Sequence, residues 1–205
     1  MINIVDILST PLAPDIGGDD EPQKPMPIEA DRCACCGFLS ECLWEGARSL
    51  YTCSHAVCTL CYLTGHLDSR TAAHGLLIWI PELSISSLIH LQRQALIARC
   101  FGDKNQRRQG KRILHYLTRH SREVELSFGS SRAVEFSVSM QRLPLNMRQV
   151  LQTRLSGCAL LLPHDVFENP RLLQAKNKSI KQQLTSFSYK TYQRSDLYAE
   201  PCSLA

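Results

Sequence analysis

An apolar stripe with the spacing of a helix runs between Ser84 and Gly102. Its members recur at steps of three and four residues, and others widen it: Leu88, Leu91, Ala95 and Ala98, flanked by Ile85, Ile89, Leu96 and Ile97. This pattern predicts an α-helix that is largely buried, because the apolar face is too broad for a surface helix. Ser84 is a favourable N-cap for this helix, and Gly102 is suited to end it.

Weaker patterns predict the remaining elements of the body. Residues 76–80 are expected to form a strand that ends at Pro81, and residues 159–163 form an apolar run the size of one buried strand. Further helices are expected over residues 106–128, 133–140, 144–155 and 171–184. Trp79, in the first of these strands, belongs either to the core or to a groove that receives a partner.

The ends of the chain differ from this body. Residues 1–30 hold five prolines, a Gly-Gly pair and several acids, so we expect a disordered acidic arm. Residues 186–205 are expected to form a mobile tail. We find no signal-peptide pattern at the start and no apolar run long enough to span a bilayer. The prediction is a cytoplasmic protein without direct membrane insertion, with one domain over residues 31–185.

Basic residues are concentrated after the acidic arm. Residues 104–122 hold seven bases and no acid, and residues 171–194 hold six bases and no acid. Such segments attract acidic proteins, nucleic acids or anionic lipids. A solvated helix face explains them equally well.

The cysteines carry the most specific chemistry. The chain has ten, of which seven lie between Cys33 and Cys61. In a chain without an export signal, such a cluster favours a metal site over disulfides. Cys33 and Cys36 form one C-x2-C pair, which has the form of a zinc knuckle. Cys58 and Cys61 form the second knuckle. Four thiolates in a tetrahedron suit Zn²⁺ and leave no open position for a substrate, so we predict a structural zinc site.

The other residues of this region leave two interpretations open. Cys35, Cys42, Cys53 and His55 either bind a second metal or are small core residues or alternative ligands in a crowded loop, and we favour the second interpretation. Between them, residues 38–40 and 49–52 are expected to pair as strands, and a short helix is expected between Cys61 and Thr71. The predicted fold class is α+β: a small treble-clef or HNH-like zinc module, residues 31–75, fused to a mainly helical body, residues 76–185.

Catalytic signatures are missing from the sequence. We find no G-x-S-x-G, Walker A or H-E-x-x-H motif. An HNH nuclease needs a second histidine and an asparagine, but His55 is the only histidine between the knuckles, and no asparagine lies between Asn3 and Asn105. We therefore predict no catalytic residues and no enzyme activity.

The chain resembles the IcmJ/DotN family of Dot/Icm type IVB secretion systems, which has relatives in IncI-type conjugation. The matching motifs are Cys33-x-x-Cys36-Gly37-Phe38, Cys58-x-x-Cys61 and Leu77-Ile-Trp-Ile-Pro-Glu-Leu83, with weaker similarity as far as Gln174. The loop between the knuckles is shorter than in the family, and the acidic arm differs from it.

The resemblance implies a function and a set of partners. Family members look like degenerate HNH nucleases with zinc knuckles, and they bind the cytoplasmic C-terminal extension of the coupling ATPase DotL. DotM and the IcmS–IcmW chaperones belong to the same complex. The resemblance therefore implies a zinc-stabilised adaptor held at the inner membrane by its partner. A nucleic-acid-binding zinc module and a divergent nuclease that uses His55 are the alternatives.

Overall fold

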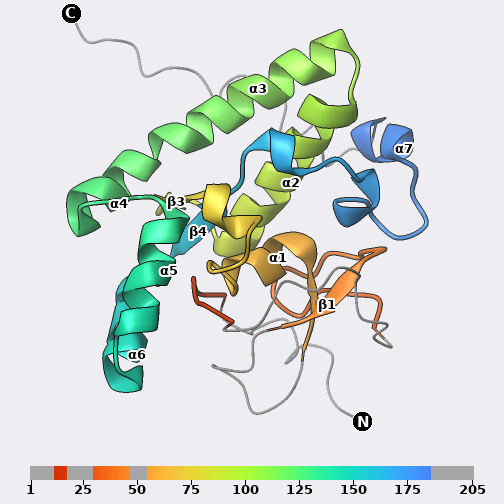
Figure 1. The fold of residues 1–205 in the computed structure, drawn as a ribbon. Helices are drawn as coiled ribbons and strands as arrows, with labels where there is room; N and C mark the ends of the chain where they lie inside the picture. Colours follow the sequence, from red (N-terminus) through yellow and green to blue (C-terminus); the bar gives the residue numbers. More distant parts are fainter. Residues whose placement is uncertain (1–11, 18–29, 47–54, 186–205) are drawn as a thin grey trace, which may run out of the picture.

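A computed structural model describes residues 12–17, 30–46 and 55–185 of the chain (Figure 1). Its elements follow in the order β1 (Leu43–Glu45), β2 (Ala56–Cys58), α1 (Thr59–Thr64), β3 (Leu76–Trp79), α2 (Ile85–Phe101), α3 (Lys104–Arg119), α4 (Ser121–Phe128), α5 (Ala133–Arg142), α6 (Leu145–Arg154), β4 (Cys158–Leu161) and α7 (Ile180–Thr185). Short 3₁₀ helices lie at Ala72–His74, His164–Val166 and Pro170–Leu172. The fold therefore mixes helices and strands, as predicted. The tail at residues 186–205 lies outside the described residues.

Two small antiparallel sheets organise the described chain. β1 pairs with β2 as a hairpin, with Leu43 opposite Cys58. β3 pairs with β4 from much later in the sequence, with Leu76 opposite Leu161 and Trp79 opposite Cys158. The strands predicted at residues 76–80 and 159–163 are therefore both present, and they are partners.

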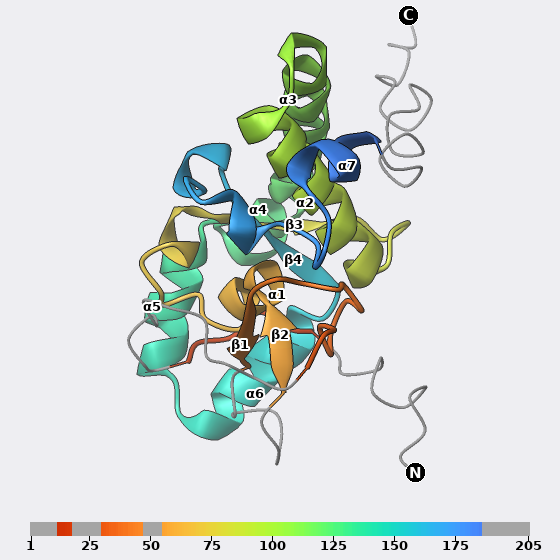
Figure 2. The ribbon, with the colours of Figure 1, turned by 90° about the vertical axis from the view of Figure 1, so that its right-hand side faces the viewer.

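Helix α2 forms the centre of the body. Ser84 caps it as predicted, since the Ser84 hydroxyl accepts a hydrogen bond from the Ser87 backbone N–H at 3.1 Å. The apolar stripe of α2 is buried. Figure 1 shows α3 on one side of α2, with α1 and the β1–β2 hairpin on the other. Figure 2 shows β1, β2 and α1 grouped together, below α2 and α7.

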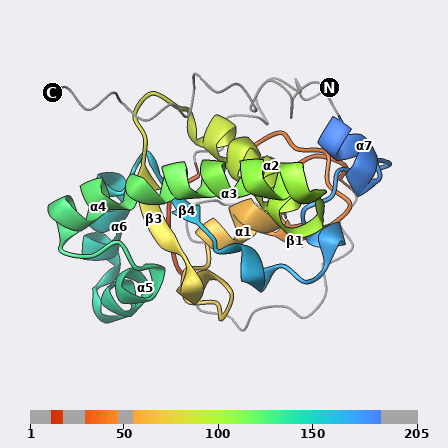
Figure 3. The ribbon, with the colours of Figure 1, turned by 90° about the horizontal axis from the view of Figure 1, so that it is seen from above.

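Helices α2 and α3 pack closely at Gly110, and Figure 3 shows α3 lying over α2. A Cβ atom on Gly110 would lie 2.6 Å from the Ala95 carbonyl oxygen and 2.8 Å from the Arg99 backbone nitrogen. Both atoms belong to the backbone of α2, which cannot turn aside as a side chain can. The contact between the two helices therefore requires glycine.

We expect Gly110→Ala to destabilise the protein even though alanine is the better helix former. Forcing the helices apart costs about 1–3 kcal/mol, and the gain in helix propensity offsets roughly 1 kcal/mol of that cost. Chemical denaturation of Gly110→Ala and of Arg108→Ala, an exposed position on the same helix, would measure the difference. Equal stability of the two variants would contradict this account of the packing.

The predicted helix over residues 106–128 is wrong in its continuity. The chain forms α3 and α4, with a break at His120. The His120 N–H turns back to the Leu117 carbonyl at 3.1 Å, while the His120 carbonyl accepts from the Trp79 N–H at 3.3 Å. His120 is both the C-cap of α3 and the N-cap of α4, and at this junction the chain also contacts β3. Leu126, on α4, is 72% exposed.

The helix predicted over residues 171–184 is also wrong in extent. Only α7 (Ile180–Thr185) is α-helical there. The Ala175 N–H donates to the Gln183 side chain at 2.9 Å, and Asn177 has a positive φ of 59°. Both features end a helix rather than continue it. The helices predicted at 133–140 and 144–155 are confirmed as α5 and α6.

The elements beside the cysteines differ in position from the prediction. Residues Leu39 and Ser40 make isolated bridges to Arg32 and Ala175 instead of forming a hairpin strand. The first hairpin strand is β1, and the second predicted strand, at residues 49–52, lies outside the described residues. Helix α1 begins at Thr59, before Cys61 rather than after it.

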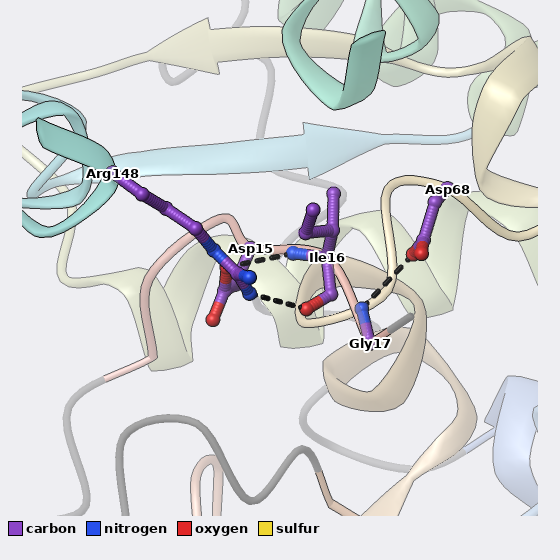
Figure 4. Close-up of polar contacts among 5 residues, drawn as sticks. All are labelled: Asp15, Ile16, Gly17, Asp68 and Arg148. Carbon is purple, nitrogen blue, oxygen red and sulfur yellow. Dashed lines mark hydrogen bonds and ion pairs between the residues drawn. The ribbon is translucent and has the colours of Figure 1, made fainter. Parts of the chain in front are cut away.

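Part of the N-terminal arm packs against the body. The sequence predicts disorder over residues 1–30, yet Asp15 is only 1% exposed. Its carboxylate accepts from the Ile16 N–H at 2.7 Å and from Arg148 Nε, on α6, at 2.9 Å (Figure 4). The Gly17 N–H donates to the Asp68 carboxylate at 3.0 Å. Residues 12–17 are therefore hydrogen-bonded both to α6 and to the segment that follows α1. The rest of the arm, up to residue 29, lies outside the described residues.

Candidate metal centre

The first cysteine pair lies in a tight turn. The Gly37 N–H donates to the Cys33 carbonyl at 2.9 Å, and the Cys36 N–H points at the Cys33 sulfur at 3.5 Å. Gly37 follows the turn with a φ of +71°, a conformation that residues with a Cβ rarely adopt. Gly37 therefore supplies the left-handed residue that this turn requires.

The second pair lies where the hairpin meets the helix. Cys58 ends β2 and precedes α1, and Cys61 lies in the first turn of α1. All four cysteines are buried free thiols, and their sulfurs lie within 4.8 Å of one another. Cys36 Sγ and Cys58 Sγ are 3.6 Å apart, close to the separation of about 3.8 Å between thiolates in a tetrahedral zinc complex. The arrangement predicted from spacing is present, and it is compatible with a metal ion.

Because the four thiols lie so close together, their pKa values are shifted in opposite directions. Hydrogen bonds from Cys33, Cys58 and Cys61 hold the pKa of the Cys36 thiol far below its usual range. Burial, the largest cause, raises the pKa of Cys58 well above that range, and hydrogen bonds to the neighbouring cysteines raise that of Cys61. Four thiols this close cannot all ionise by themselves. A bound cation supplies the charge that allows it.

Arg93 on α2 brings a positive charge to the cluster. Its side chain is 1% exposed, and its Nη2 donates to Cys58 Sγ at 2.8 Å and lies 3.9 Å from Cys36 Sγ. The guanidinium also covers the ring of Phe38, at 3.7 Å from the centroid. Burial lowers the pKa of Arg93, but the thiolates of Cys58, Cys36 and Cys61 outweigh burial and raise it overall.

A polar edge of α2 docks on the first knuckle. His90 Nε2 lies 2.8 Å from the Cys36 carbonyl and therefore carries the proton that it donates. His90 Nδ1 is then free to accept from Arg93 Nη1 at 3.3 Å. One turn earlier, the Ser86 hydroxyl donates to the Cys35 carbonyl at 3.4 Å.

Sequence reasoning missed this polar edge. Neither Arg93 nor His90 was singled out from the sequence. The available signal was the spacing: Ser86, His90 and Arg93 recur at steps of four and three, along one edge of a helix with a broad apolar stripe. Such a stripe indicates that one edge of a buried helix meets polar groups.

The candidates for a second metal site do not gather with one another. Among the described residues, the only group of three or more potential ligands is Cys33, Cys36, Cys58 and Cys61. Cys35 touches that group, since hydrogen bonds to Cys33 and Cys61 lower the pKa of its thiol to about 5. Cys42 and His55 lie outside the group, and Cys53 is not among the described residues.

Two cavities lie on the body, away from the cysteines. The first, of about 280 Å³, lies between α3, the start of β3 and the segment after β4. We call it the basic groove: Leu114, Leu161 and Leu162 line it together with Arg99, Lys111 and three histidines, His74, His115 and His164. The second, of about 440 Å³, is lined by Trp79, Val124, Phe128 and Cys158. Trp79 is 41% exposed, so it belongs to a hollow and not to the core alone.

These features define a class of protein: a mixed helix-and-strand fold with a closed four-cysteine centre compatible with a metal ion. None of the described helices is both long and apolar enough to cross a membrane. No family model matches the chain, and no curated protein is significantly similar to it.

Proposed function

We propose that this protein is a zinc-stabilised adaptor subunit of a type IVB secretion or conjugation coupling complex, without catalytic activity. Its partner is the cytoplasmic C-terminal extension of a coupling ATPase of the DotL type. DotM-like and IcmS–IcmW-like subunits complete the complex, which holds the adaptor at the inner membrane.

The chemistry of the cluster supports zinc as its metal. Four buried cysteine sulfurs within 4.8 Å of one another are the ligand set of a structural zinc site. Cys33, Cys36, Cys58 and Cys61 would hold the ion, which would link the knuckle, the hairpin and α1 into one folded unit. All four positions are cysteines, so no position remains open for a substrate.

The order of elements around the cysteines supports a treble-clef or HNH-like module. A knuckle with Cys33 and Cys36 is followed by the β1–β2 hairpin, and then by a helix that carries Cys61. In a nuclease of this type, the hairpin and helix hold a catalytic metal by histidines. Here His55 is the only histidine of that region, which supports a module that has kept the scaffold without the catalysis.

The basic groove is the observation that carries the binding part of the proposal. Apolar side chains line it together with Arg99, Lys111 and histidines, and none of the described residues that line it is an acid. Beside it, Arg107, Arg108 and Arg112 extend the positive charge along the exposed face of α3. An acidic peptide with an apolar side chain at its centre complements such a surface in both charge and shape.

Reversing the charge beside the groove tests the proposal. We expect the replacement of Arg107, Arg108, Lys111 and Arg112 by glutamate to weaken binding of the ATPase extension by roughly 100-fold or more, since opposite charges become like charges across the interface. The salt dependence of the remaining binding should fall as well. Calorimetric titration of the full chain with the purified extension, at two salt concentrations, would measure both effects.

A matched variant separates the groove from net charge. Replacing the exposed residues Arg132, Arg142, Lys178 and Lys181 by glutamate changes the net charge equally but leaves the groove intact. This control should bind the extension almost normally. The exposed bases of α3 also favour phosphate contacts. If the groove variant keeps the extension but no longer retains DNA, the protein is instead a nucleic-acid-binding zinc module.

A further inference from the structure

Arg93 is a buried cation without a buried carboxylate. Among the described residues, its polar partners are two cysteine sulfurs and one histidine nitrogen, and none of them is a carboxylate. Removing a guanidinium from water is costly unless a negative charge compensates for it. The fold must therefore supply that negative charge at the cysteine cluster.

The geometry fixes Arg93 for this contact. Phe38 supports one face of the guanidinium at 3.7 Å, and His90 accepts a hydrogen bond from Nη1 at 3.3 Å. These contacts hold Nη2 against Cys58 Sγ at 2.8 Å. Phe38 and His90 also flank the first knuckle, because Phe38 follows Cys36 closely and His90 binds the Cys36 carbonyl.

We infer that Arg93 is a dedicated counter-cation for the metal centre, and that it couples metal occupancy to the docking of α2. The inference rests on the proposed zinc site. Four thiolates around a divalent cation form a complex with excess negative charge, which the adjacent guanidinium partly neutralises. An N–H···S bond also withdraws electron density from a thiolate, so it makes Cys58 a poorer nucleophile toward oxidants and competing electrophiles.

This role predicts an effect that depends on the metal. With zinc bound, Arg93 has a strong anionic partner, and Arg93→Met should remove a stabilising contact. Without zinc, the region from the knuckle to α1 is expected to unfold, so Arg93 no longer has this anionic partner to stabilise the fold. The same substitution should then leave the melting temperature unchanged or raise it. A side chain that only fills space would change both forms in the same direction.

The experiment measures zinc affinity and stability in the full-length protein. Zinc retention against a chromogenic chelator should fall at least tenfold in Arg93→Met, and thermal melts should be recorded with and without zinc under reducing conditions. Arg93→Gln keeps an N–H donor without the charge and should lie between Arg93→Met and the unchanged protein. Arg99→Met removes an arginine from the same helix away from the cysteines, and it should retain zinc normally. In cobalt-substituted protein, Arg93→Met should shift the thiolate-to-cobalt charge-transfer bands, which a remote packing change would not.

Distinct outcomes overturn the inference and the proposed site. If Arg93→Met and Arg99→Met retain zinc equally, or if Arg93→Met lowers the melting temperature equally with and without zinc, Arg93 is not a counter-cation. If Arg93→Met fails to fold, Arg93→Gln decides through the same retention assay. An unchanged protein that binds no zinc would instead refute the zinc site itself.

Discussion

Replacing Cys58 by alanine is expected to abolish tight zinc binding and to unfold the region from the knuckle to α1. Cys58 is 1% exposed and lies at the junction of β2 and α1, so its sulfur connects the hairpin, the helix and Arg93. Structural zinc contributes about 10–16 kcal/mol of apparent binding free energy in small zinc modules. Total stabilities of domains are only about 5–15 kcal/mol, and losing the ion should therefore exceed what the surrounding packing can offset.

Elemental analysis and circular dichroism would measure this loss. The unchanged chain should contain one zinc ion, and Cys58→Ala should contain little after dialysis against a mild chelator. Cys42→Ser is the matched control, since Cys42 belongs to the same region but not to the four-cysteine group. Retention of zinc at normal affinity by Cys58→Ala, or its loss in Cys42→Ser, would refute the ligand assignment.

Local patterns in the sequence were sufficient for the elements that depend on local physics. The apolar stripe of α2, the Ser84 cap and the strand before Pro81 follow from side chains a few residues apart. The four-cysteine group follows from two C-x2-C spacings, because two residues three apart lie close together both in a tight turn and at the start of a helix. The β1–β2 hairpin is needed only to bring the two pairs together in space. The 21 residues between Cys36 and Cys58 are long enough to form such a hairpin.

Features that depend on distant partners were not predictable in the same way. At the break at His120, the His120 carbonyl accepts a hydrogen bond from Trp79 on β3, a contact that periodicity does not encode. Asp15 is buried because Arg148, on α6, neutralises it, whereas composition alone indicates a disordered arm. Arg93 is similar: a long charged residue in an apolar stripe is understood only once the cysteines are placed beside it.

Gln92 shows how a polar residue in that stripe can determine stability. It is 1% exposed on α2. Its side-chain amide donates to the Leu160 carbonyl at 2.8 Å and its oxygen accepts from the Leu162 N–H at 2.7 Å. A single side chain thus satisfies two backbone groups at the outer edge of β4. Nothing in the sequence of β4 indicates that these backbone groups require a side-chain partner. The sequence therefore offered no reason to single out Gln92.

We expect Gln92→Leu to destabilise the protein by about 2–4 kcal/mol, because two buried backbone groups lose their partners at about 1–3 kcal/mol each. For a chain of this size, that loss corresponds to a melting temperature lower by roughly 6–12 °C. Gln94, on the same helix, is 8% exposed, and its Oε1 is buried without a hydrogen-bond partner among the described residues. Gln94→Leu should therefore be neutral or slightly stabilising, since it removes an unsatisfied polar atom. Thermal melts of both variants compare the same chemical change with and without hydrogen bonds. Equal melting temperatures would show that packing alone, and not the link between α2 and β4, governs this part of the core.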